Sequence, residues 1–179
     1  YGFAALLMGS FVAVYNAATF RLEGPYGLTT SLASLVFLSY LLGSGASPVA
    51  GWLAGRSSPG PVVPVSVAIM GGGLALTLAE PLGVFVAGIA VVTVGFFAAH
   101  GAASGWVATR AALGGRPVGQ AAALYSFWYY AGSSVGGTVA GRAWEAGGWP
   151  AVVLFTGSMT AAALVLTVVL ARTRRLAAA

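Results

Sequence analysis

Residues 82–108 read LGVFVAGIAVVTVGFFAAHGAASGWVA, which is 27 consecutive residues without a charged side chain. A helix that crosses the hydrocarbon core of a bilayer needs about 20 mostly apolar residues. The strands of a membrane β-barrel would instead be segments of about 10 residues with alternating polarity. The stretch is too long and too uniformly apolar for a barrel strand, so we predict a transmembrane helix.

Five more charge-free stretches of spanning length accompany it, at residues 2–20, 31–54, 61–79, 118–141 and 149–171. The whole chain is 59% hydrophobic and only 6% charged. These proportions exclude a water-soluble globular domain, which carries about 25% charged residues, and they exclude a disordered chain, which is poor in apolar residues. We therefore predict an all-α membrane protein in which residues 1–179 form one domain of six transmembrane helices.

The charged residues predict how these helices are oriented. The second and fourth connections and the C-terminal tail contain no acid and six arginines, Arg56, Arg110, Arg116, Arg172, Arg174 and Arg175. The other three connections mix both signs, with Arg21, Glu23, Glu80, Arg142 and Glu145. Cytoplasmic loops carry the excess of positive charge, which places both termini in the cytoplasm and the protein in the cell (inner) membrane. The basic tail is then a topology signal, and no nucleic-acid partner is expected.

The sequence also matches itself at an offset of about 89 residues. Residues 40–44 read YLLGS and residues 129–133 read YYAGS, and Pro61 corresponds to Pro150. If the repeat is real, each copy contains three helices, and an odd number of crossings inverts the second copy in the membrane. The chain begins with Tyr1 inside an apolar run, so we expect it to have been cut from a longer protein.

Aromatic and polar side chains are concentrated in four of the six predicted helices. The helices at 61–79 and 149–171 hold few of them and are expected to face lipid, whereas the other four are expected to line a cavity. The cavity candidates are Tyr15, Asn16, Tyr40, His100, Tyr125, Trp128, Tyr129 and Tyr130. An aromatic belt at the membrane surface is the alternative for part of the group, and it explains Tyr129 and Tyr130 least because they lie near mid-span.

His100 is the only titratable group in the middle of a predicted span, which makes it a candidate for handling protons. The alternative is a neutral histidine held by one neighbouring hydroxyl. Small residues predict close helix packing, with Pro48 expected to bend its helix. The packing candidates are Gly43, Pro48, Gly132, Gly136, Gly137 and Gly141.

The residues needed for enzymatic chemistry are missing from the pattern. An intramembrane serine protease of the rhomboid type would need Gly-x-Ser-Gly, and the nearest approach is Ala102-Ala103-Ser104-Gly105. A His-Glu-x-x-His metal site needs two histidines, and the chain has one. We expect no enzyme activity, no cofactor and no metal.

Three segments resemble the C-terminal half of a major facilitator superfamily transporter, in particular the bacterial drug or sugar efflux branch. They are YNAATFRL at 15–22, GFFAAHGAASGW at 95–106, and QAAALY at 120–125 continuing to YYAGSSVGG at 129–137. A weaker match is Gly51-Trp52-Leu53-Ala54-Gly55-Arg56, which is similar to the superfamily's cytoplasmic loop motif Gly-x-Leu-Ala-Asp-Arg. Gly55 stands where the motif has Asp, so the latch attributed to that carboxylate is in doubt.

The resemblance implies helices seven to twelve of a twelve-helix secondary transporter, arranged as a three-plus-three inverted repeat. The expected function is proton-coupled efflux of a small organic solute by alternating access, in a lipid bilayer and together with a missing N-terminal six-helix half. No carboxylate lies inside any predicted span, so a coupling carboxylate would have to belong to that half. A non-transporting six-helix scaffold or assembly protein is the alternative, and an intramembrane protease is a distant third.

Overall fold

The computed structural model describes residues 1–177, with side chains up to Arg172, and every element in this range is a helix. The predicted tail arginines Arg174 and Arg175 lie outside the described side chains. The elements in chain order are α1 (Gly2–Glu23), α2 (Thr30–Ala33), the 3-10 helix η1 (Ser34–Ser39), α3 (Tyr40–Arg56), α4 (Pro59–Leu76), α5 (Leu82–Leu113) and α6 (Val118–Ala177).

Five helical stretches in the described residues are long and apolar enough to cross a membrane. They are Gly2–Glu23, Thr30–Arg56, Pro59–Leu76, Leu82–Leu113 and Val118–Arg172. The prediction of an all-α membrane protein is therefore confirmed, whereas the predicted count of six helices is not. The count differs because the last two predicted spans belong to one helical element, α6.

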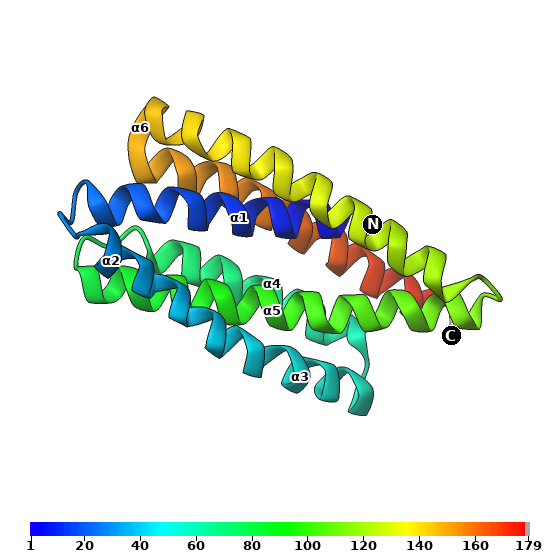
Figure 1. The fold of residues 1–179 in the computed structure, drawn as a ribbon. Helices are drawn as coiled ribbons and strands as arrows, with labels where there is room; N and C mark the ends of the chain where they lie inside the picture. Colours follow the sequence, from blue (N-terminus) through cyan, green and yellow to red (C-terminus); the bar gives the residue numbers. More distant parts are fainter. Residues whose placement is uncertain (178–179) are drawn as a thin grey trace.

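A two-residue break interrupts α6. Gly147 (φ −170°, ψ 26°) and Gly148 (φ 61°, ψ −151°) are not helical, and at this point the chain turns back on itself (Figure 1). The positive φ of Gly148 costs glycine little because it has no Cβ. The connection predicted from the sequence covers 142–148, but the helix continues through Arg142 and Glu145 and leaves only the two glycines to make the turn.

Helix ends also differ from the predicted span limits. α5 runs to Leu113 instead of 108, because the side chain of Arg110 is exposed and a charged residue there does not have to end the helix. α4 ends at Leu76 instead of 79, where the Thr77 side chain donates to the carbonyl of Leu74. The helix α3 continues through Pro48.

The helices form two groups. α1 packs mainly against α6, and α5 packs mainly against α3 and α4, whereas α1 and α5 have few contacts with each other. Figure 1 shows α1 and α6 together in one group and α3, α4 and α5 in the other. α4 and α6 supply a further contact between the groups.

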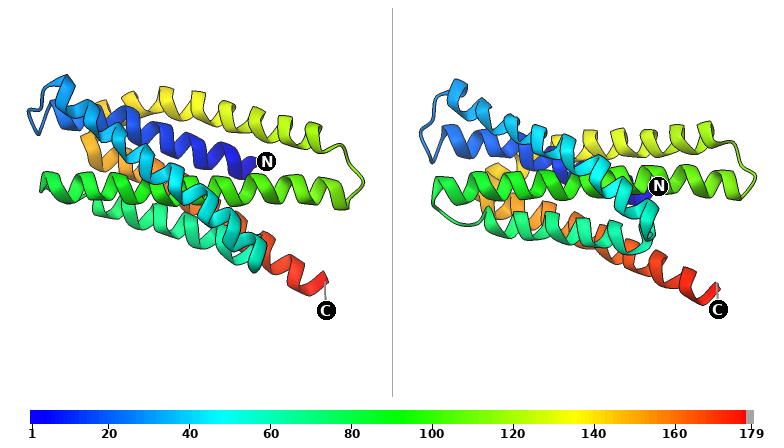
Figure 2. Two further views of the ribbon diagram at one scale, coloured as in Figure 1. Left: turned by 60° about the horizontal axis from the view of Figure 1, so that its bottom comes forward. Right: turned by 90° about the horizontal axis from the view of Figure 1, so that it is seen from below.

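Connections and termini lie at the two ends of this elongated bundle (Figure 2). We call one the arginine-rich end, where residue 1, Ser57–Ser58, Gly114–Pro117 and the end of α6 lie. The arginines near it are Arg56, Arg110, Arg116 and Arg172. The other, mixed-charge end has the connections 24–29 and 77–81 and the break in α6, and the charged residues near it are Arg21, Glu23, Glu80, Arg142 and Glu145. The two sets of charges that the sequence separated thus lie at opposite ends of the molecule.

Candidate functional site: an aromatic cluster between the helix groups

Large rings fill the space between α1 and α5. The rings of Phe11 on α1 and Phe96 on α5 are stacked with centroids 3.8 Å apart. Around this pair lie further rings from η1, α3, α5 and the first part of α6. We call the whole set the aromatic cluster; it consists of Phe11, Tyr15, Phe37, Tyr40, Phe96, Phe97, His100, Tyr125, Tyr129 and Tyr130.

Tyr15 ties one side of the cluster together. Its hydroxyl lies 2.5 Å from the Ser39 hydroxyl and 2.5 Å from the Thr93 hydroxyl, which joins α1 to η1 and α5. Its ring stacks on Tyr40, with centroids 4.9 Å apart. Only 3% of Tyr15 is exposed, so this predicted cavity residue lies in the core and acts as a bridge between helices.

His100 lies on the other side, where α5 meets the first part of α6. Its Nδ1 atom is 3.1 Å from the hydroxyl of Tyr125. Its ring lies 4.9 Å from that of Tyr129 and stacks on Phe96 at 6.0 Å. Three of the predicted residues therefore meet in one place, although they come from helices separated in sequence.

The other three cavity candidates lie apart from this meeting point. Tyr130 touches the cluster only through Tyr129 and is 65% exposed. Trp128 is 41% exposed and packs against Phe127. Asn16 is exposed on α1, close to Gly137 of α6.

The packing candidates lie mostly where helices approach most closely. A Cβ built on Gly132 or Gly136 would overlap the backbone of Ala5 or Gly9 in α1, and one on Gly43 would overlap the ring of Phe97 in α5. A Cβ on Gly141 would meet nothing within 4 Å, so the structure shows no close helix approach there. Small residues at such positions let two backbones come together in a membrane.

The loop motif lies at the arginine-rich end. The Arg56 guanidinium lies over the Trp52 ring, 4.1 Å from its centroid. Cβ atoms built on Gly51 and Gly55 would meet nothing within 4 Å. Gly55 stands where the motif has Asp, and the described contact of the neighbouring Arg56 is a cation–π interaction with Trp52.

Arg21 is not among the site residues predicted from the sequence, although it is one of the few buried polar residues, with 8% exposed. Its guanidinium donates hydrogen bonds to the carbonyls of Thr77 and Ala79, just after α4. The rings of Phe85 and Trp149 lie 4.7 and 5.5 Å from it. The signal in the sequence was an arginine between Phe20 and Leu22, inside an uninterrupted helical pattern.

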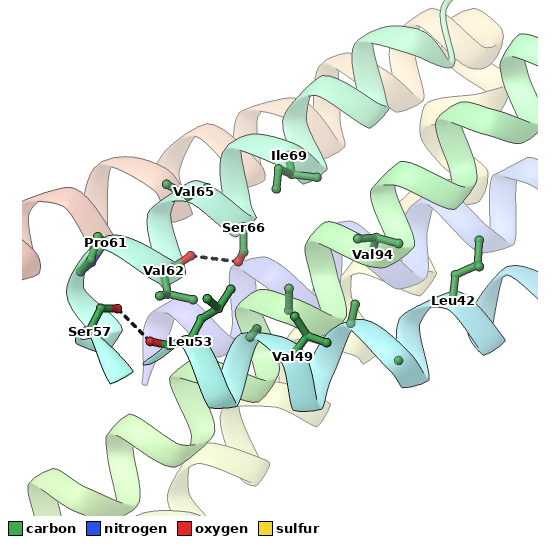
Figure 3. Close-up of a pocket in the computed structure, with 14 residues that line it drawn as sticks. Leu42, Val49, Leu53, Ser57, Pro61, Val62, Val65, Ser66, Ile69 and Val94 are labelled. Carbon is green, nitrogen blue, oxygen red and sulfur yellow. Dashed lines mark hydrogen bonds between the residues drawn. The ribbon is translucent and has the colours of Figure 1, made fainter. Parts of the chain in front are cut away.

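A groove lies between α3, α4 and α5, apart from the aromatic cluster, with a volume of about 590 Å³ (Figure 3). Aliphatic side chains line most of it, including Val49, Leu53 and Ile69. The hydroxyl of Ser57 donates to the carbonyl of Leu53, and the hydroxyl of Ser66 donates to the carbonyl of Val62, one helical turn earlier in each case. The groove therefore offers apolar surface, and the chemically varied site is the aromatic cluster.

Within the described residues, no three His, Asp or Glu side chains come together as a metal site would require. The aromatic cluster instead presents rings, hydroxyls and one imidazole. Such groups can stack on a planar solute, donate or accept hydrogen bonds, and bind one proton.

Known proteins similar to this chain are membrane transporters. The Bacillus subtilis (strain 168) protein named Uncharacterized MFS-type transporter YybF is 38% identical over 168 residues, which is 93% of this chain and 41% of that protein. The Escherichia coli (strain K12) Inner membrane transport protein YnfM is 41% identical over 160 residues, 89% of this chain and 38% of that protein. An Uncharacterized transporter from Buchnera aphidicola subsp. Schizaphis graminum is 34% identical over 140 residues, 78% of this chain and 33% of that protein.

These relatives, together with an all-helical fold of membrane-spanning length, define the chain as part of a membrane transporter. It belongs to the major facilitator superfamily. The chain spans about two fifths of the length of the relatives it matches. No family model and no solved structure matches it.

Proposed function

We propose that the chain is the C-terminal half of a secondary transporter that exports a small organic solute in exchange for protons by alternating access. The observation that carries the proposal is the aromatic cluster, which joins two helix groups whose central helices, α1 and α5, have little other contact. Rings can slide over one another while keeping apolar surface buried. Such an interface suits two groups of helices that change their relative position.

An inverted repeat is supported by the places of closest helix approach. Gly43 and Ser47 of α3 lie against Phe97 and Gly101 of α5. Gly132 and Gly136 of α6 lie against Ala5 and Gly9 of α1. The α3 and α6 members of the two sets are 89 positions apart, and the α1 and α5 members are 92 apart. The two helix contacts are therefore related by nearly the same shift along the sequence. This is expected if a unit of three helices is repeated and the break at Gly147–Gly148 separates the fifth crossing from the sixth.

The proposed second half is supported by the lengths of the relatives, of which this chain spans 33 to 41%. It is also supported by exposed apolar side chains on η1, α3 and the first part of α6. They include Leu41 (72%), Leu35 (55%), Phe127 (63%) and Val135 (59%). Exposed apolar side chains of this kind are ones that lipid or another bundle of helices would cover.

His100 is our candidate for the proton-handling group, because the charge-free stretches predicted to span the membrane contain no Asp or Glu that competes for the role. The Tyr125 hydroxyl that contacts it would also satisfy a purely structural histidine. The experiment below therefore separates a proton-handling His100 from a purely structural one. The proposed solute contacts are Tyr129, whose ring lies beside His100, and Tyr40 and Tyr130 elsewhere in the aromatic cluster.

Cysteine labelling tests the proposal, since the chain contains no cysteine. Single cysteines replace Tyr130 (65% exposed) and Leu154 (76% exposed) in a cysteine-free form of the intact transporter. In proteoliposomes with a membrane-impermeant thiol reagent, we expect Tyr130→Cys to react and Leu154→Cys to stay protected by lipid. A pH gradient, imposed by changing the pH only on the unlabelled side, should change the rate at Tyr130→Cys.

Two results would contradict this function. Equal protection of both cysteines would favour a non-transporting scaffold, because a transport pathway has to admit water. A labelling rate at Tyr130→Cys that does not change with the pH gradient would refute proton coupling. Loss of the response in His100→Gln would assign the coupling to that imidazole, and an unchanged response would remove His100 from the mechanism.

A further inference from the structure

A small cavity lies between His100 and the arginine-rich end. It has a volume of about 110 Å³ and is lined by residues of α1, α4, α5 and both parts of α6. Tyr125 forms part of its wall, and so does Val107, two turns along α5 from His100. The cavity therefore adjoins the one residue that is hydrogen-bonded to His100.

The cavity is large enough and polar enough to hold water. A buried water needs two to four polar partners and at least about 10–15 Å³ of space, and the volume exceeds this several-fold. Tyr1, Arg110, Tyr125 and Thr167 supply polar groups, and the remaining wall is mostly apolar. Arg110 is exposed, so the cavity is bordered by a side chain that reaches the arginine-rich end of the molecule.

We propose that protons reach His100 from the arginine-rich end through this cavity, with the Tyr125 hydroxyl as the last relay. The inference rests on the proposed function of His100. A water in the cavity gives a proton to the Tyr125 oxygen while Tyr125 gives its own proton to Nδ1 of His100. The phenol is regenerated, the water is left one proton poorer and the imidazole becomes imidazolium; the reverse sequence releases the proton.

The groups around this route are few. The titratable or charged side chains that face His100 or the cavity are Tyr125 and Tyr129 of α6, Arg110 of α5 and Tyr1 before α1. α4 contributes Val63, and the second part of α6 contributes Thr167 and Leu170. None of these three titrates, so Tyr125 is the one phenol that both contacts Nδ1 of His100 and borders the cavity.

Two substitutions test the route, with a matched control. Tyr125→Phe removes the relay hydroxyl and keeps the ring, and Val107→Phe fills the cavity. Tyr26→Phe is the control, because it removes a phenol hydroxyl that donates to the carbonyl of Glu80 at the mixed-charge end, away from His100 and the cavity. The readout is the change in labelling of Tyr130→Cys when a pH gradient is imposed on proteoliposomes of the intact transporter.

We expect Tyr125→Phe and Val107→Phe to lose the gradient response and Tyr26→Phe to keep it, with thermal denaturation midpoints checking that each variant is folded. If His100→Gln loses the response but Tyr125→Phe keeps it, the route is wrong and the role of His100 stands. If His100→Gln keeps the response, the proposed function of His100 fails first. Should Val107→Phe not fold, Tyr125→Phe decides alone, because it changes one atom of a side chain that is 5% exposed.

Discussion

Arg21 shows how one residue can fix several helix ends at the mixed-charge end. It belongs to the last turn of α1, and its guanidinium donates to the carbonyls of Thr77 and Ala79 after α4. Carbonyls at a helix C-terminus have no partners within the helix and carry partial negative charge, so a cation there is stabilising. The indole of Trp149, which also lies near the guanidinium, donates to the Thr77 hydroxyl. One arginine thus connects α1, the end of α4 and the start of the second part of α6.

Arg21→Gln is therefore expected to destabilise the intact transporter. Hydrogen bonds from a charged group contribute about 1.5–3 kcal/mol each, and removing one partner leaves buried carbonyls unsatisfied. We expect a loss of about 2 kcal/mol or more, seen as a lower midpoint in thermal denaturation followed by tryptophan fluorescence. Arg142→Gln is the control, because Arg142 is exposed on α6. Equal midpoints for the two variants would show that Arg21 does not lock these ends.

At the scale of helices, the contact of α1 with α6 depends on a backbone approach that only glycine permits. Cβ atoms on Gly132 and Gly136 would lie about 2.5 and 2.6 Å from the Cα atoms of Ala5 and Gly9. Because these neighbours are backbone atoms in a packed helix, a rotamer change cannot make room for the added carbon.

Gly132→Ala and Gly136→Ala should each force the helices apart. Overpacking costs about 1–3 kcal/mol, which exceeds the gain of about 1 kcal/mol from replacing glycine by alanine in a helix. Gly141→Ala is the matched control, because its Cβ would meet nothing within 4 Å, and it should be neutral or stabilising. The measurement is the denaturation midpoint of each variant, and similar shifts for all three would contradict the packing.

The charged residues predicted most of the helices because charge is the strongest signal that a chain has left the membrane. They failed for the last two, since Arg142 and Glu145 remain helical and the turn is made by Gly147–Gly148 alone. The Gly-Gly-Trp-Pro sequence was the better marker there. The packing partners of each helix could not be predicted, because a helix in lipid can be apolar on all faces and then carries no periodic signal.

At the scale of the whole molecule, the sequence predicted which helices hold the aromatic residues but not how the rings meet. The stack of Phe11 on Phe96 and the bond between His100 and Tyr125 join helices that are far apart in the chain. Such pairs depend on helix rotation and depth, which local sequence does not determine. The sequence also predicted Tyr15 to be a cavity residue, whereas the structure buries it against Ser39, Tyr40 and Thr93.

The arrangement of the ends leads to a prediction about topology. Glu23 is the last residue of α1 and Ala146 directly precedes the break in α6, so both lie at the mixed-charge end, whereas Ser58 directly precedes α4 and Leu113 ends α5 at the arginine-rich end. All four residues are exposed. If the chain crosses the membrane six times with its arginines in the cytoplasm, single cysteines at Glu23 and Ala146 react with an impermeant thiol reagent in intact cells. Those at Ser58 and Leu113 then react only after the membrane is opened. Protection of Ala146→Cys from both sides would mean that the break lies within the bilayer, and the opposite sidedness would reverse the orientation.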